Sequence, residues 1–164
     1  EVDLEADIER TMRGFLYLIS GDSLRNGDIR EPFDGHFPAG QSMTEQLISP
    51  EELPAWLTKD DLKFYVDEIT RTGFRGGLNW YRNINKIPAI TAPFLGSTIE
   101  QPSFYMGGST DLIAGNTPEA ISSMQQALGD LRHCEIIEGA GHWIQQECAS
   151  EVSSAMVAFL EGLN

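Results

Sequence analysis

Asp111 and His142 are of residue types that can act together as an acid and a base, and each follows a short apolar run. Gly107-Gly108-Ser109-Thr110 leads into Asp111, and Gly139-Ala140-Gly141 leads into His142. A carboxylate that holds one ring nitrogen of a histidine fixes the tautomer, so that the other nitrogen can take a proton from water or from a nucleophile. The two residues therefore indicate the orienting and basic part of a hydrolase triad.

Each residue also has a purely structural interpretation. An aspartate after Gly-Gly-Ser-Thr suits a turn, and a histidine in a Gly-Ala-Gly-His-Trp loop could cap the helix that follows. The catalytic interpretation is favoured because both positions fall where a predicted strand ends. In open parallel sheets, ligands and catalytic groups gather at the carboxyl ends of the strands.

The elements that must position this pair alternate between strand and helix. A strand is predicted over 102–108, then a helix capped by Thr117 and stopped by Gly129, then a second strand near 134–137. The last helix is expected after Ser150 and before Gly162, with one apolar face. This order is typical of a parallel sheet in an α/β protein, and it would bring the loops of Asp111 and His142 side by side.

The first half of the chain is predicted to be helical with loops. Apolar residues at spacings of three and four indicate one helix from near Asp3 to just before Gly21. Residues 21–57 carry glycine and proline too densely for a regular element, so we expect a long structured loop there. A capping-box pattern at Thr58 predicts a helix over 60–72, and a short helix is expected within 78–83. We place a domain boundary at 93/94.

Composition limits the class of partner. Eleven Lys+Arg stand against 25 Asp+Glu, a formal net charge of −14, which disfavours nucleic acid and anionic membranes and suits a neutral or apolar small molecule. No apolar run is long enough to span a membrane, and the acidic start predicts a soluble, cytoplasmic chain. Cys134 and Cys148 are expected to be reduced thiols. No ligand cluster or phosphate loop appears, so we expect neither metal nor cofactor.

Four stretches of the chain, in this order, resemble the soluble epoxide hydrolases of the α/β-hydrolase fold. The stretches are Leu-Pro-Ala-Trp-Leu-Thr at 53–58, Gly-Phe-Arg-Gly-Gly-Leu-Asn-Trp-Tyr-Arg-Asn at 73–83, Gly-Gly-Ser-Thr-Asp at 107–111 and Gly-Ala-Gly-His-Trp-Ile-Gln-Gln-Glu at 139–147. The resemblance implies the C-terminal portion of an α/β-hydrolase parallel sheet over 94–164. It implies a mostly helical cap, or lid, over 1–93.

The resemblance also implies a mechanism. In this family an aspartate attacks an epoxide carbon, two lid tyrosines donate hydrogen bonds to the epoxide oxygen, and a His–acid pair activates water to hydrolyse the ester. His142 matches the base, Asp111 the acid that orients it, and Tyr81 one lid tyrosine, while Trp80 and Trp143 are candidates to line the substrate pocket. A phenol suits the lid because it stabilises charge developing on oxygen while staying protonated at neutral pH.

The chain departs from the family at the nucleophile. The family's Gly-x-Asp-Trp-Gly elbow and its His-Gly-x-Pro oxyanion segment are absent from these 164 residues, and no Gly-x-Ser-x-Gly elbow is present. Gly35-His36-Phe37-Pro38 has similar letters in the wrong order, so His36 is interpreted as a loop residue. We expect an N-terminal half, on a separate chain or on the same polypeptide, to supply the nucleophile, and this chain alone to be inactive.

Three functions remain open from the sequence. The first is hydrolysis of a small apolar epoxide to a vicinal diol. The second is a dehalogenase of the same fold, which needs no lid phenol and is therefore disfavoured by Tyr81. The third is a binding module that kept the fold and lost its nucleophile. A homo-oligomer is compatible with each of them.

Overall fold

The computed structural model describes residues 1–29, 37–38, 40–111, 113 and 115–163. The chain forms two compact units, which are treated separately below. The helical unit comprises Glu1–Leu18 and Phe37–Leu95, and the sheet unit comprises Ile19–His36 and Gly96–Asn164. The expectation for His36 falls outside the described residues.

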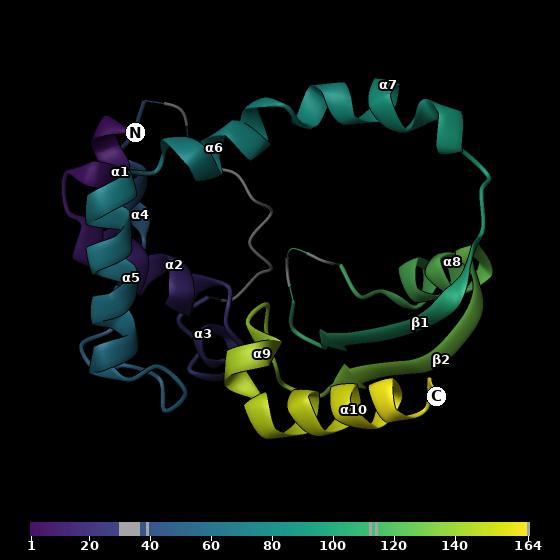
Figure 1. The fold of residues 1–164 in the computed structure, drawn as a ribbon. Coiled ribbons are helices and arrows are strands. Elements are labelled where there is room, and N and C mark those ends of the chain that lie inside the picture. Colours follow the sequence, from purple (N-terminus) through teal and green to yellow (C-terminus); the bar gives the residue numbers. More distant parts are fainter. Residues whose placement is uncertain (30–36, 39, 112, 114, 164) are drawn as a thin grey trace. The chain divides into compact units, whose positions relative to one another are not determined.

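The helical unit contains short and medium helices and no strand among its described residues (Figure 1). Its helices are α1 (Val2–Glu5), α2 (Ile8–Leu18), α4 (Met43–Gln46), α5 (Lys59–Thr72), α6 (Arg75–Arg82) and α7 (Ile87–Thr91), with the 3-10 turns η1 (Ile84–Lys86) and η2 (Ala92–Phe94). Helices α2 and α5 pack together, and leucines fill the space around them. The buried apolar residues are Leu4, Leu16, Tyr17, Leu18, Leu47, Leu57 and Leu62.

The single helix expected from Asp3 to Gly21 is wrong in one respect, because it is broken after Glu5. The side chain of Asp7 accepts the N–H of Arg10 at 3.0 Å and so caps the new helix α2. An aspartate competes with the helical backbone for hydrogen bonds, which favours a fresh start over continuation at this position.

The helix predicted over 60–72 is confirmed as α5. Thr58 accepts the N–H of Asp61 at 3.1 Å, and Asp61 accepts the N–H of Thr58 at 3.0 Å, which completes the capping box. The hydrogen bonds from Thr58 also lower the pKa of the Asp61 carboxyl. Gly73 ends the helix with φ of 67°, a conformation that favours glycine.

The expectation that 21–57 holds no regular element is wrong at two places. Helix α3 (Gly21–Arg25) lies in the sheet unit, and helix α4 lies in the helical unit. Ser42 caps the start of α4, since its hydroxyl accepts the N–H of Glu45, and the carboxylate of Asp3 accepts the N–H of Met43 at 2.8 Å. Short helices of this kind depend on such side-chain caps, which a count of glycines and prolines does not reveal.

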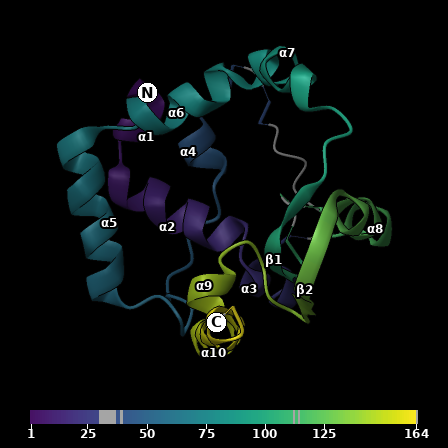
Figure 2. The same ribbon diagram turned by 45° about the vertical axis from the view of Figure 1, so that its right-hand side comes forward.

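The sheet unit is built on two parallel strands, β1 (Ile99–Gly108) and β2 (Leu128–Ile137). The helix α8 (Pro118–Ala127) connects them, and α9 (Ile144–Glu147) and α10 (Ala149–Glu161) follow (Figures 1 and 2). In the register, Tyr105 faces Cys134 and Gly108 faces Ile137. The predicted strand–helix–strand–helix order is therefore confirmed, and both strands end at the same edge.

Two predicted helix ends are wrong in the sheet unit. Gly129 does not stop the connecting helix: α8 ends at Ala127, Leu128 is already extended, and Gly129 lies inside β2. A Cβ at Gly129 would stand 2.5 Å from the carboxylate of Glu100, so a glycine permits this close approach. Ser150 lies inside α10 and not before it, since that helix begins at Ala149.

A small apolar core supports the end of the sheet where the predicted pair lies. Ala140, Ile144 and Val152 are buried and pack against Met106 and Ile137. On β1, the ring of Phe104 lies 5.4 Å from that of Phe159 of α10. Among the described residues, no helix has the length and apolar character required to cross a membrane.

Candidate active site

Asp111 and His142 meet at the carboxyl ends of β1 and β2, as the sequence predicts. His142 Nδ1 lies 3.1 Å from Asp111 Oδ1 and 3.2 Å from Oδ2. The aspartate side chain is 7% exposed, whereas that of the histidine is 32% exposed. The acid is thus enclosed and the imidazole is accessible, which suits an orienting carboxylate and a base that meets water.

The Asp111 loop is fixed by hydrogen bonds to the strand end beside it. Thr110 donates to the carbonyl of Ala140 from its N–H at 3.0 Å and from its hydroxyl at 2.7 Å. The N–H of Ser109 donates to Ile137 O at 2.9 Å. Asp111 Oδ1 also accepts the N–H of Ile113 at 2.9 Å, so the turn interpretation and the acid–base pairing hold for the same side chain.

The loop of His142 is held against the segment that begins the sheet unit. The N–H of His142 donates to Ile19 O at 2.9 Å. A Cβ at Gly141 would lie 2.4 Å from Gly21 N, and a Cβ at Gly21 would lie 2.0 Å from Gly139 O. Only glycine permits this approach of two backbones at positions 21 and 141, whereas Gly139 has a positive φ of 76°, a conformation that itself favours glycine.

Glu147 binds the same two segments through its carboxylate. Oε2 accepts the N–H of Gly21 and the N–H of Gly141, each at 2.9 Å, and Oε1 accepts the N–H of Trp143 at 3.0 Å. Helices α3 and α9 accordingly lie next to each other (Figures 1 and 2). The amides on both sides of His142 therefore donate to one carboxylate.

A second polar contact stiffens the start of the Asp111 loop. The hydroxyl of Tyr105 donates to Asn116 Oδ1, and Asn116 Nδ2 donates to Gly108 O at 2.9 Å. Burial raises the pKa of the Tyr105 phenol, and the negative charge of Asp111 raises it further. Tyr105 is thus a neutral donor that supports the backbone at the end of β1.

The other predicted site residues divide between the two units. The ring of Trp143 lies 4.9 Å from that of His142, nearly edge to face at 74°. Trp80 and Tyr81 lie on α6 of the helical unit, where the two residues are 80% and 72% exposed. The structure therefore brings Asp111, His142 and Trp143 together in the sheet unit, and it describes Trp80 and Tyr81 as exposed residues of the other unit.

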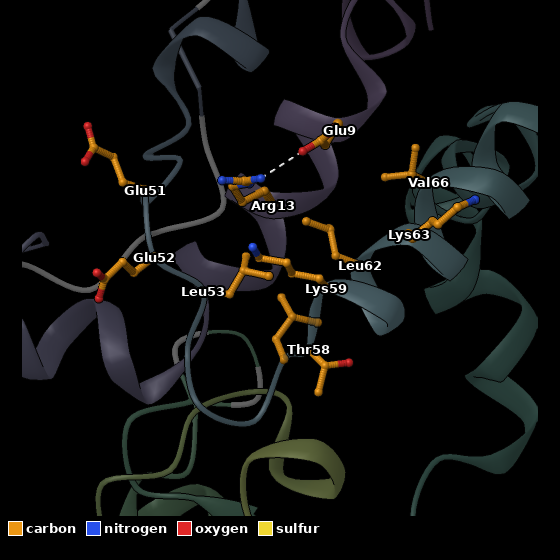
Figure 3. Close-up of a pocket in the computed structure, with 11 residues that line it drawn as sticks. Glu9, Arg13, Glu51, Glu52, Leu53, Thr58, Lys59, Leu62, Lys63 and Val66 are labelled. Atoms are coloured by element: carbon orange, nitrogen blue, oxygen red, sulfur yellow. Dashed lines mark hydrogen bonds and ion pairs between the residues drawn. The ribbon is translucent and has the colours of Figure 1, made fainter.

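A cavity of about 720 Å³ lies within the helical unit, and none of the predicted site residues lines it (Figure 3). Its lining combines acidic groups, such as Glu9 and Glu51, with Arg13, Lys59 and Lys63. Arg13 is engaged by Glu9 at 2.8 Å. The lining also includes the apolar side chains of Leu53, Leu57, Leu62 and Val66. Within the described ranges, no three His, Cys, Asp or Glu side chains are grouped so that they could hold a metal ion.

Parallel strands with an acid and a histidine at their carboxyl ends, joined to a helical region, are the arrangement expected for the C-terminal part of an α/β-hydrolase. No family model matches the chain. Comparison with curated proteins finds epoxide hydrolase A of Mycobacterium tuberculosis, which is 36% identical over 99% of this chain and 49% of its own length. An epoxide hydrolase of Caballeronia sordidicola is 34% identical over 94% of this chain and 45% of its own length.

Solved structures agree with these relatives. An epoxide hydrolase from an endophytic Streptomyces matches with a TM-score of 0.85 at 32% identity, over 99% of this chain and 48% of that one. Epoxide hydrolase A of Mycobacterium thermoresistibile matches with a TM-score of 0.79 at 35% identity, over 98% and 48%. The chain is homologous to epoxide hydrolases of the α/β-hydrolase fold along nearly its whole length. It spans about half the length of the relatives it matches.

Sequence reasoning missed Glu147 and the role of residues 19–25 as a support for the His142 loop. Glu147 stands in the Gly-His-Trp-Ile-Gln-Gln-Glu stretch, but its backbone partner Gly21 is 126 positions away. Any residue except proline can donate a backbone N–H, so the residue types at the donor positions do not reveal such a contact. The one sequence feature at this contact is that both positions where the backbones approach, 21 and 141, are glycines.

Proposed function

We propose that this chain supplies the base, the orienting acid and one lid tyrosine for the hydrolysis of an epoxide to a vicinal diol. The observation that carries the proposal is the Asp111–His142 contact of 3.1 Å at the ends of two adjacent parallel strands. The similarity of the chain to epoxide hydrolases supports the choice of an epoxide over other electrophiles. The substrate class is a small apolar epoxide, in keeping with the net charge of −14.

The first half of the reaction forms a covalent ester. A nucleophilic carboxylate attacks one epoxide carbon, the carbon–oxygen bond on that carbon breaks, and the electron pair of that bond passes to the oxygen. Tyr81 donates a hydrogen bond to that oxygen, which stabilises the developing negative charge, and the oxygen then takes a proton from solvent. We assign the nucleophile to an N-terminal portion of the hydrolase core, on the same polypeptide or on a separate chain. The sequence of residues 1–164 has no elbow motif for it.

The second half of the reaction hydrolyses this ester. His142 takes a proton from water at Nε2, the ring nitrogen that Asp111 does not contact, and the resulting hydroxide attacks the ester carbonyl. Asp111 holds Nδ1–H and stabilises the imidazolium that forms. The tetrahedral intermediate collapses, the bond between the carbonyl carbon and the diol oxygen breaks, and the proton of the added hydroxyl passes to that oxygen. The carboxylate nucleophile and the diol are released, and His142 returns its proton to solvent. The difference in exposure between Asp111 and His142 supports this division of roles.

Two tryptophans complete the proposed site. Trp143 packs edge-on against the imidazole, so it is positioned to form a wall beside the base. Trp80 is adjacent to Tyr81 on α6, and we propose that it lines the substrate pocket from the lid. No step of the reaction assigned to these residues requires a metal or a cofactor.

The experiment that tests this function is an assay of the full-length protein with a panel of apolar epoxides and haloalkanes. Diol formation without halide release is the expected result. Halide release without diol formation would favour a dehalogenase of the same fold. Tight binding of an epoxide analogue without any turnover would favour a non-catalytic module. Either of the last two results would contradict the proposal.

A further inference from the structure

We propose that Glu147 is a positioning residue for His142, acting through the backbone on both sides of the histidine. The inference rests on the proposed role of His142 as the base. The carboxylate accepts the amides of Gly141 and Trp143, which immediately precede and follow His142, and it accepts the amide of Gly21 from the neighbouring segment. One side chain thereby joins the histidine loop to the start of α3.

Both helices that meet at Glu147 lack another side-chain cap. Helix α3 begins after Ser20, whose side chain makes no capping hydrogen bond, and α9 begins after Trp143, which makes none either. The first amides of a helix need an acceptor, and a negative charge at that end is favoured by the helix dipole. Glu147 meets this need at Gly21, the first residue of α3, and it also binds the amide of Trp143, the residue before α9. Charged acceptors form the stronger hydrogen bonds.

The contact leaves little freedom for the loop that carries His142. Gly21 and Gly141 are buried, so their amides are shielded from water. Without the carboxylate they would be buried donors with no acceptor, which destabilises the folded loop. The amide of His142 is itself bound to Ile19 O at 2.9 Å. Three consecutive amides, at 141, 142 and 143, are thus hydrogen-bonded, and these bonds fix the backbone from which the imidazole extends. Asp111 then sets its orientation.

Substitution Glu147→Gln separates positioning from simple packing, because the two side chains have the same length. Glutamine offers one acceptor oxygen, and its amide group presents hydrogens to the N–H groups that the second carboxylate oxygen would accept. Either the Trp143 amide or the Gly21 and Gly141 pair then loses its acceptor. Glu151→Gln is the matched control, since Glu151 is an exposed acid in the first turn of α10.

The kinetic test is a single-turnover experiment on the full-length protein with an epoxide. In Glu147→Gln we expect hydrolysis of the ester to slow by at least about 10-fold, because small displacements of a base are costly. Formation of the ester, which does not use His142, should keep its rate. Glu151→Gln should behave as the unmodified protein. Unchanged ester hydrolysis would overturn the inference, and so would an equal fall in both steps together with a lower melting temperature.

A second readout does not depend on activity. Hydrogen exchange on the full-length protein should be slow, at similar rates, for the amides of Gly21, Gly141 and Trp143. In Glu147→Gln, exchange should be faster at all three amides. Fast exchange at these amides in the unmodified protein would overturn the inference even if the glutamine variant failed to fold. If the protein forms no ester from any epoxide, the proposed function fails, and the exchange result still decides whether Glu147 holds the loop.

Discussion

The His142 loop of the sheet unit and residues 75–94 of the helical unit carry predicted site residues in opposite surroundings. The loop is enclosed: its flanking amides reach Glu147, and the side chain of Asp111 is only 7% exposed. Residues 75–94 are all described, and none of them is buried. Tyr81 and Trp80 there are among the most exposed large side chains. Contacts within one unit therefore hold Asp111 and His142 in place, whereas Trp80 and Tyr81 are open to solvent, and the lid role proposed for them requires a substrate or further parts of the protein to cover them.

Among the variants that test this comparison, Asp111→Asn should have the largest effect, which is on the rate of ester hydrolysis. The amide keeps the shape of the side chain but favours the wrong tautomer of His142, so ester hydrolysis should fall about 10³- to 10⁴-fold. The rate of ester formation should be unaffected, as measured by rapid quench of the full-length protein. Asp67→Asn, on the exposed face of α5, is the control. Hydrolysis at the normal rate in Asp111→Asn would remove the pair from the mechanism.

Tyr81→Phe should show the opposite kinetic pattern. Loss of one donor to the epoxide oxygen should slow ester formation about 10²-fold while leaving hydrolysis of the preformed ester unchanged. Tyr65→Phe, on the neighbouring helix α5, provides a matched removal of a hydroxyl. Equal rates of ring opening for Tyr81→Phe and the unmodified protein would show that this exposed phenol has no part in the chemistry.

Gly141→Ala tests how tightly the histidine loop is packed. Its Cβ would lie 2.4 Å from Gly21 N and 2.7 Å from Ile19 O, both backbone atoms that have little room to move. We expect a loss of about 2 kcal/mol in the free energy of unfolding, measured with urea. A stability equal to that of the unmodified protein would mean that the two segments are not in contact in solution.

Gly76→Ala is the counterpart in the exposed region and should have the smallest effect. No atom lies within 4 Å of a Cβ at this position on α6, and its backbone is helical. Alanine should therefore stabilise the helix by up to about 1 kcal/mol. Destabilisation, measured in the same urea titration as Gly141→Ala, would show that residues 75–94 are packed more closely than the structure describes.

The elements that carry the pair could be predicted because their signals are local. Apolar runs ending in glycine marked β1 and β2, and Thr117 before Pro118 marked the start of α8. Parallel pairing then placed Asp111 beside His142 without further information. Recognition of the four motif stretches added the family, which composition alone could not supply.

The supports of the pair could not be predicted because they depend on backbone groups distant in sequence. Nothing in the pattern of residues 19–25 indicates that α3 packs against the His142 loop. Its contacts there are the Gly21 amide on Glu147, the Arg25 guanidinium on the carbonyl of Gly139, and a close approach of backbones. The break at Asp7 was missed for a related reason. The apolar spacing continues across it, while the hydrogen bond from Arg10 N–H decides the local structure.

The most direct test of the role of His142 is intact-protein mass spectrometry of the full-length His142→Gln variant after incubation with an epoxide. We predict a stable adduct whose added mass equals that of the epoxide, because the ester forms but its hydrolysis lacks a base. His133→Gln, which alters a histidine of β2 stacked on Phe104, should show no accumulation. Normal diol production by His142→Gln, with no adduct, would contradict the assignment of His142 as the base.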